Sequence, residues 1–295
     1  MAAENFEALQ TKVAALREVE TPLVSAGVSP HSPYTVSAPQ LEMISKYALA
    51  ENLPVMMHAA ESQGEELLLR EGRGQFAEGL RKRGIEWSIP ATSSIQYLAN
   101  HGILQTKPLL AHCITVDEAD IQTIKDSGVG IAHCPKSNAK LGHGRAPFEK
   151  FLRASVAVGL GSDSVASNNI CDLLEEARFA VLSARAGDTR LHGKPAAEDG
   201  LRAATEGGAG AMGLADKIGM LEPGKQADFT AVSLRGIHQQ PVYDPYSALI
   251  FTSSARDVIL TVVAGREIFK DGLITTIDEE RLVARMNEIA AKLRA

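Results

Sequence analysis

Short apolar runs alternate with amphipathic segments over the first two thirds of the chain. The apolar runs lie at 23–28, 55–57, 109–113, 129–134 and 156–160, and most segments between them carry apolar residues at helical spacing. Nearly continuous apolar strands that alternate with helices are typical of parallel βα units whose sheet is covered by helices. The pattern therefore predicts an α/β fold with a parallel sheet.

Helical spacing and chain-breaking residues define the segments between these strands. Pro30 and Pro33 keep His31 on a rigid loop, and Ser137 and Asn138 are expected in a loop as well. We predict helices at 4–19, 38–51, 62–84, 93–101, from about 117, at 146–154, 172–186 and 196–213.

The pattern changes near residue 218. Two segments, 219–233 and 258–272, have the composition of strands joined by tight glycine turns, and no helix connects paired strands there. They predict a small antiparallel β element, followed by a terminal helix at 278–293. We therefore divide the chain into a βα part at 1–217 and a β part with its helix at 218–295.

Polar side chains with metal and acid–base chemistry follow all five apolar runs of the first part. Four successive runs are followed by a histidine and the fifth by an aspartate: His31, His58, His112, His133 and Asp163. A single histidine at a strand end is more often a hydrogen-bonded core residue than a ligand. Because the carboxyl ends of parallel strands share one face, however, the set is better interpreted as one site.

Within this set the residue types suggest different roles. His58, His112 and Asp163 offer two imidazoles and a carboxylate, which suit a divalent transition metal with an open position for water. Glu61, three residues after His58, is the best candidate for a general acid or base. Two structural alternatives remain open: Glu61 can complement a helix dipole, and Asp163 can cap a loop.

Two His-Cys pairs resemble zinc motifs, at His112-Cys113 and His133-Cys134. Adjacent strand residues point to opposite faces, so the two thiols should face the packed side when the histidines face the site. We therefore predict two small buried thiols. The remaining histidines lie on predicted helices or loops and are expected at the surface: His101, His143, His192 and His238.

Charge and composition exclude several classes of partner. The net charge is -6, aromatic residues are few and no Lys or Arg run occurs, so we expect a small-molecule substrate and no nucleic acid. Three cysteines suit a reducing cytoplasm, and no apolar run or signal-peptide pattern indicates a membrane. The prediction is a cytoplasmic protein, with a homo-oligomer left open.

Six segments together resemble the amidohydrolase superfamily, with the 5-methylthioadenosine and S-adenosylhomocysteine deaminases as the nearest branch and the s-triazine chlorohydrolases close behind. They are 29–35 (SPHSPYT), 58–61 (HAAE), 111–113 (AHC), 133–138 (HCPKSN), 161–169 (GSDSVASNN) and 222–228 (EPGKQAD). The resemblance implies a (β/α)8 TIM-type barrel with a β-sandwich, and hydrolytic release of ammonia from aminated purine nucleosides.

The resemblance also implies roles for individual residues. His58 and Asp163 would bind one divalent ion, zinc first, with iron or manganese as alternatives. Glu61 would carry a proton to the substrate ring nitrogen, and Asp163 would accept one from the attacking water. His112 would orient or deprotonate that water, which revises its assignment as a ligand. The substrate itself is expected to contact His31, Glu61 and His133, with the ribose near His31.

The sequence departs from this family in one respect. The family places a His-x-His pair of metal ligands at the end of its first barrel strand, and this sequence contains no His-x-His. Its first motif corresponds to the family's fourth strand, so we expect an incomplete barrel, part of the sandwich and impaired deamination. The alternatives are a triazine chlorohydrolase or aminohydrolase, and a non-catalytic truncated relative.

Overall fold

The computed structural model describes residues 2–188, 190 and 192–294 of the 295-residue chain. At its centre lies a parallel sheet of four strands, β1 (Met56–Ala59), β2 (Leu109–His112), β3 (Gly130–His133) and β4 (Val158–Leu160), in that order. Each strand pairs in parallel with the next. The prediction of parallel βα units is thus confirmed for these strands.

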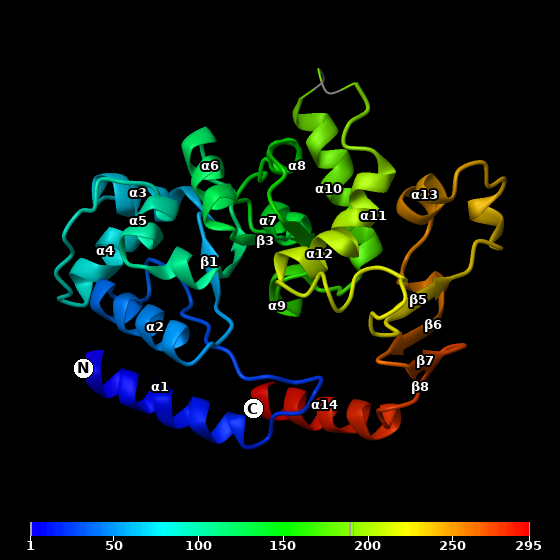
Figure 1. Cartoon of the computed structure of the whole chain (residues 1–295), viewed down its shortest axis with the longest axis horizontal. Coiled ribbons are helices and arrows are strands. Elements are labelled where there is room, and N and C mark those ends of the chain that lie inside the picture. Colours follow the sequence, from blue (N-terminus) through cyan, green and yellow to red (C-terminus); the bar gives the residue numbers. More distant parts are fainter. Residues whose placement is uncertain (1, 189, 191, 295) are drawn as a thin grey trace.

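Helices connect the strands and flank the sheet (Figure 1). The chain enters through α1 (Ala2–Arg17) and α2 (Ala38–Ala50), and α3 (Gln63–Glu71), α4 (Gln75–Lys82) and α5 (Ser94–Asn100) follow β1. The later connections contain α6 (Glu118–Ser127), α7 (Pro135–Lys140), α8 (Phe148–Ala154), α9 (Val165–Asn168), α10 (Leu173–Gly187), α11 (Ala197–Ala204) and α12 (Glu206–Ala211).

The main core lies between the sheet and its covering helices. One row of paired strand residues crosses all four strands and is buried: Met57, Leu110, Ile131 and Val158. Phe148 and Phe151 of α8 belong to the same cluster and are also buried. Burying one such side chain contributes about 1.5–3 kcal/mol to the stability of the fold. A shift of one residue in the pairing would expose this row, so its burial fixes the register and aligns the strand ends.

The predicted strand at 23–28 is wrong for most of its length. Leu23 and Val24 are exposed, and Val28 alone reaches the parallel sheet, through a single bridge to Val55. Pro30 lacks the N–H that a continuing ladder needs, and the run offers too few apolar side chains to bury a longer strand.

Two predicted helices are each split in two. The segment 62–84 breaks at Gly72 and Gly74, whose φ values are +62° and +89°, in the left-handed region that glycine favours. The segment 196–213 breaks at Thr205, whose hydroxyl donates to the Leu201 carbonyl oxygen at 2.8 Å and competes with the helical backbone.

The expected loop at Ser137 and Asn138 is also wrong. Both residues lie in the short helix α7, which Pro135 begins. A proline at the first helical position loses no hydrogen bond, because the N–H groups there have no intrahelical acceptor. Pro135 therefore ends the strand, as predicted, and starts a helix as well.

The C-terminal β element is antiparallel, as predicted. Strands β5 (Phe229–Val232), β6 (Val258–Val263), β7 (Arg266–Lys270) and β8 (Leu273–Ile274) form a second sheet in chain order. The terminal helix α14 (Glu279–Arg294) follows it. Figure 1 shows this sheet at the opposite end of the molecule from α3, α4 and α5, with the parallel sheet between them.

The segment between β5 and β6 returns to the helices of the first part. It contains the short helix α13 (Pro245–Ser247) and buried Ile250, which clusters with Ala177 and Ala197. Arg178 Nε donates to the Ile250 carbonyl oxygen at 2.7 Å. The division at residues 217 and 218 stays a prediction.

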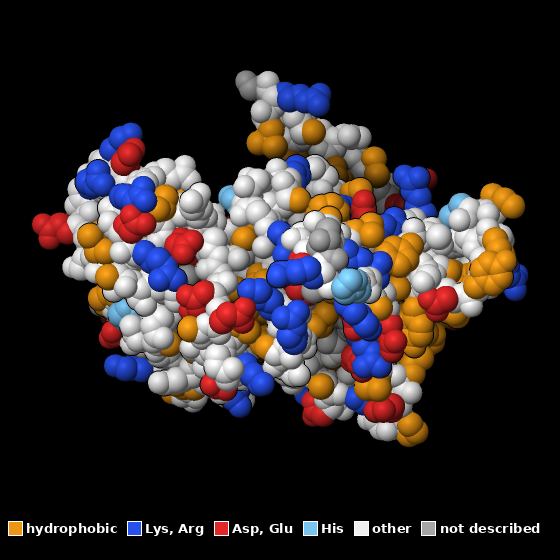
Figure 2. All heavy atoms as spheres, turned by 90° about the horizontal axis from the view of Figure 1, so that it is seen from above, with side chains coloured by type: hydrophobic (Ala, Val, Ile, Leu, Met, Phe, Trp, Pro, Cys, Tyr) orange, Lys and Arg blue, Asp and Glu red, His pale blue; other side chains and the backbone are white. Residues whose placement is uncertain are grey.

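Charged side chains of both signs are interspersed over the face seen from above, and apolar side chains gather toward the side of the C-terminal sheet (Figure 2). Tyr243, Ile237 and Leu273 are among the exposed large apolar residues of that region. Among the helices that the structure describes, none combines the length and apolar character needed to cross a membrane.

Close packing of α12 on the sheet yields a test of the fold. A Cβ atom added at Gly130 would lie 2.0 Å from the Ala211 carbonyl oxygen, a backbone atom of α12. Gly130→Ala should therefore lower the free energy of unfolding by roughly 1–3 kcal/mol, the usual cost of overpacking.

The matched control is Gly210→Ala on α12 itself, where an added Cβ would meet no atom within 4 Å. This change should be neutral or stabilise the chain by about 0.4–1 kcal/mol, because alanine restricts the unfolded chain and favours helix. Urea denaturation of the two variants compares them, and equal midpoints would contradict the packing of α12.

Candidate active site

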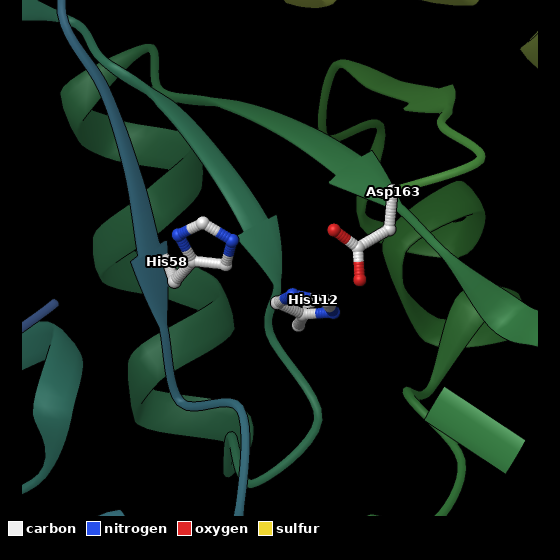
Figure 3. A group of neighbouring side chains, drawn as sticks. All are labelled: His58, His112 and Asp163. Atoms are coloured by element: carbon white, nitrogen blue, oxygen red, sulfur yellow. The ribbon is translucent and has the colours of Figure 1, made fainter. Parts of the chain in front are cut away.

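Three side chains with metal-binding atoms converge at the carboxyl ends of the parallel strands (Figure 3). His58 lies on β1, His112 ends β2, and Asp163 follows β4 by three residues. Their ligand atoms all lie within 4.8 Å of one another. Zinc binds imidazole nitrogen and carboxylate oxygen at about 2.0–2.2 Å, so small side-chain movements would allow these atoms to hold one ion.

Unusual backbone conformations turn these side chains toward a common point. His112 and Asp163 have φ values of +74° and +57°, and Ala60, two residues after His58, has +52°. Non-glycine residues rarely adopt this left-handed region, and such strain concentrates at functional sites. These left-handed residues end the regular strand geometry at the same edge of the sheet where the three side chains lie.

Hydrogen bonds orient both imidazole rings. His58 Nδ1 lies 3.1 Å from the His31 carbonyl oxygen, and His112 Nδ1 lies 2.8 Å from Asn138 Oδ1. These oxygens accept, so each Nδ1 carries a proton, and in the neutral ring Nε2 offers the free lone pair.

The environment of His112 fits a neutral ligand. Its Nε2 is buried and has no hydrogen-bond partner among the described residues. Burial, the largest effect, lowers the pKa of His112 below the usual histidine range. A neutral ring with an unpaired buried acceptor is what a metal ion or a substrate-directed water needs.

Asp163 is held as a carboxylate by the neighbouring loops. Ser137 Oγ and Ser167 Oγ donate to its Oδ2 at 2.5 and 2.7 Å, and the Ser164 N–H donates to Oδ1 at 2.7 Å. Burial alone would raise the pKa of Asp163, but these hydrogen bonds outweigh it and lower the pKa below its usual value.

Glu61 lies beside this cluster and is largely buried. Its Oε1 is 3.7 Å from His112 Nε2 and 3.6 Å from His143 Nε2, and its Oε2 accepts a hydrogen bond of 3.2 Å from the Tyr34 hydroxyl. Burial, together with the nearby Glu61 charge, raises the pKa of Tyr34 to about 12, so this phenol stays a neutral donor.

The sequence predicts His143 at the surface, and the structure leaves it partly exposed but also brings its ring to the site. The turn at Gly142 and Gly144, both with positive φ, folds back so that the His143 N–H donates to the Asn138 carbonyl oxygen at 2.9 Å. Its ring then faces Glu61. The glycines on both sides of His143 were the only sequence signal for this turn.

The two other predicted histidines lie around the cluster in different ways. His31 is exposed, and its ring centroid is 4.9 Å from that of His58. His133 is buried and stacks on Phe148, with centroids 5.3 Å apart. Burial lowers the pKa of His133 to about 3, and the described part of the chain offers neither of its ring nitrogens a partner. The substrate roles of both stay predictions.

The two cysteines of the His-Cys pairs are not part of the donor group. Cys113 and Cys134 are buried, and neither belongs to the His58, His112 and Asp163 cluster. Burial raises the pKa of Cys134 to about 12 and raises that of Cys113 as well. The prediction of two buried thiols is confirmed.

Sequence reasoning missed the buried carboxylate that fixes the turn at Glu61. Glu65 of α3 is 0% exposed and accepts the N–H of Ala60 at 2.8 Å and that of Glu61 at 3.2 Å. The Ser94 hydroxyl also donates to it. Burial is the main reason that the pKa of Glu65 is raised to about 7. In the sequence, Glu65 is indistinguishable from any acidic residue in the first turn of a helix.

Comparison with known proteins finds a matching family and several similar proteins. The profile of the Amidohydrolase family matches residues 2–268. A 5-methylthioadenosine/S-adenosylhomocysteine deaminase from Pelotomaculum thermopropionicum is 35% identical over 270 residues, which are 92% of this chain and 58% of that protein. The protein of the same name from Pyrococcus abyssi is 34% identical over 278 residues, 93% of this chain and 60% of that one.

Solved structures show the same similarity. The structure of an adenosine deaminase from Xanthomonas campestris with bound zinc superposes with a TM-score of 0.83 at 31% identity. The match covers 97% of this chain and 61% of the deaminase chain. The structure of the atrazine chlorohydrolase TrzN from Arthrobacter aurescens TC1, complexed with zinc, has a TM-score of 0.80 at 26% identity. That match covers 94% of this chain and 58% of the TrzN chain. The chain spans about 60% of the length of these four proteins.

The environment of Glu65 predicts a pH dependence of stability. Its pKa is about 7 in the folded chain against an ordinary value of 4.5, so between these pH values the folded state retains a proton that the unfolded state has lost. The free energy of unfolding should therefore fall as pH rises through this window, by roughly 3 kcal/mol from this group.

Glu65→Gln should remove this component, and Glu66→Gln at the adjacent, partly exposed position should keep it. Denaturant unfolding of the three proteins at pH 5 and pH 8 measures the difference. An unchanged pH dependence in Glu65→Gln would show that Glu65 is not buried as described.

Proposed function

The chain belongs to the amidohydrolase family, and from that premise we propose that it supplies the site of a metal-dependent hydrolytic deaminase of aminated purine nucleosides. The observation that carries the proposal is the convergence of His58, His112 and Asp163 beside Glu61. The names of the relatives support the substrate class, since two of them are 5-methylthioadenosine/S-adenosylhomocysteine deaminases.

The donor set fits one divalent ion. Two neutral imidazoles and a carboxylate suit zinc, and the two related structures described above contain zinc, whereas iron and manganese accept the same ligands. His58 and Asp163 would hold the ion, with His112 next to them. A bound ion there would lower the pKa of a water molecule and so supply a nucleophile near neutral pH.

The protein side chains would then move the protons. Water adds to the amine-bearing ring carbon while Glu61 delivers a proton to the adjacent ring nitrogen. Asp163 and neutral His112 Nε2 are placed to accept the proton that the water releases. Collapse of the adduct breaks the C–N bond as the leaving nitrogen takes the proton held by Asp163 or His112, and Glu61 regains its proton from the adduct hydroxyl. Ammonia therefore leaves, and the ring keeps a carbonyl oxygen.

The surrounding groups suit a nucleoside. Tyr34, which orients Glu61, stacks on Phe76 with ring centroids 4.3 Å apart, and this pair offers an apolar wall beside the carboxylate. His31 is exposed next to His58 and can contact ribose hydroxyls. We also propose that His133 contacts the substrate, because both of its ring nitrogens lack partners among the described residues while its ring stacks on Phe148.

We propose further that the chain on its own has impaired activity. It contains no His-x-His and spans about 60% of the relatives' length. With three donor side chains, the remaining coordination positions of a bound ion would be left to solvent. An ion with fewer protein ligands is held in a less well defined geometry. A non-catalytic relative that only binds its ligand is the limiting case.

A second candidate function is hydrolysis of a triazine ring with loss of chloride or an alkylamine. The similarity to TrzN, with a TM-score of 0.80 at 26% identity, favours it. Both functions need the same metal and acid–base groups, so they differ only in the ring and its leaving group.

Substrate binding separates these functions. We expect the zinc-loaded chain to bind 5′-methylthioadenosine in calorimetry, and Glu61→Ala to weaken that binding by roughly 10–100-fold through loss of one charge-assisted hydrogen bond. Glu66→Ala is the control.

Release of chloride from atrazine without nucleoside binding would favour the second candidate function. Ammonia release by the chain alone at a rate typical of enzymes, about 10 per second, would contradict the proposed impairment.

The metal site has its own test. Zinc at about 100 times its dissociation constant should stabilise the wild-type chain by about 2.7 kcal/mol and raise its melting temperature accordingly. His58→Ala and Asp163→Asn should lose most of this gain. His101→Ala should retain it, because His101 pairs with Glu42 away from the cluster. Equal zinc effects in all four proteins would contradict the site.

A further inference from the structure

Two connections that follow strands, here called loops although the first is the short helix α7, provide most of the hydrogen bonds that orient the candidate metal-binding side chains. The first is α7, which follows β3 and presents Ser137 to Asp163 and Asn138 to His112. The second is the segment 161–169 after β4, which carries Asp163 itself. A residue that fixes both loops would therefore fix the geometry of the site.

Glu176 forms hydrogen bonds to both of these loops. It lies in the first turns of α10, is 0% exposed, and accepts the Lys136 N–H of α7 at 3.2 Å. Its other oxygen accepts from Asn168 Nδ2 at 2.5 Å, and the same Nδ2 group donates to the Ser162 carbonyl oxygen at 2.6 Å. One carboxylate thus binds one donor from each loop.

The helix that carries Glu176 is a rigid support. Asp172 caps α10 by accepting the N–H groups of Leu174 and Glu175, and Ala177 and Ala180 are fully buried. An apolar side chain at position 176 would leave the Lys136 N–H without this acceptor and Asn168 Nδ2 with the Ser162 carbonyl oxygen alone, and glutamine would face one of these donors with its own NH₂ group.

We propose that Glu176 is a positioning residue that holds α7 and the 161–169 segment together and thereby sets the orientation of His112 and Asp163. The inference rests on the proposed function, because it treats those two side chains as the working groups of the site. Among the described residues no hydrogen bond joins Glu176 to His58, His112 or Asp163, so it acts through the two loops.

Hydrogen exchange tests the link between the loops. Glu176→Gln should speed amide exchange in peptides covering 134–140 and 161–169 at least about tenfold, because local opening becomes easier. The matched control is Asp120→Asn, another buried carboxyl, which accepts from Ser93 Oγ and the Asp117 N–H and contacts neither loop. Its effect should be confined to the regions of Ser93 and Asp117.

Zinc affinity, measured by competition with a chromophoric chelator, tests the consequence for the site. Glu176→Gln should weaken zinc binding by roughly 10–100-fold, the usual effect of losing an outer-shell support, and Asp120→Asn by less than about twofold. Should Glu176→Gln fail to fold, Asn168→Ser removes the link on one side only and should loosen 161–169 alone.

Unchanged exchange in both loops, or looser loops with wild-type zinc affinity, would overturn the proposal. Equal loss of zinc affinity in Asp120→Asn would reduce the role of Glu176 to general stability and overturn it as well. A wild-type chain that binds no zinc would instead defeat the proposed function, and the exchange measurement would still decide whether Glu176 joins the loops.

Discussion

Hydrogen bonds from the strand-end turns to buried carboxylates hold the candidate site in place. Glu65 binds the backbone of Ala60 and Glu61, and Glu176 binds α7 and Asn168. These turns contain left-handed non-glycine residues, which persist only where the surrounding structure enforces them. Burying a carboxylate is costly, and the raised pKa values of Glu65 and Glu176 express that cost, so stability and precise placement of the site are linked.

Periodicity found the four parallel strands and most of the helices, and the family resemblance supplied the barrel type. The predicted α/β fold of the (β/α)8-barrel type and the amidohydrolase resemblance are confirmed by the family match and the similar structures, and the antiparallel C-terminal sheet lies where glycine turns placed it. The prediction that His58, His112 and Asp163 come together is confirmed, because parallel strands bring their carboxyl ends to one edge of the sheet.

The failures have two physical origins. The strand at 23–28 and the long helix at 62–84 were inferred from local composition, but prolines and left-handed glycines ended them. The site contacts of Asn138 and His143 escaped notice because their partners, His112 and Glu61, are distant in the sequence. Glu176 escaped notice because one of its two partners, Lys136, is distant as well. Hydrogen-bond partners of this kind depend on how elements pack, and a single sequence shows the side chain without showing what it faces.

X-ray absorption at the zinc edge of the zinc-loaded chain tests the central claim most directly. If the strand ends form the metal site, zinc should have nitrogen and oxygen neighbours at about 2.0–2.2 Å, with the multiple-scattering signature of imidazole. Sulfur neighbours at about 2.3 Å would contradict the account, because they would place Cys113 or Cys134 on the metal instead of in the core.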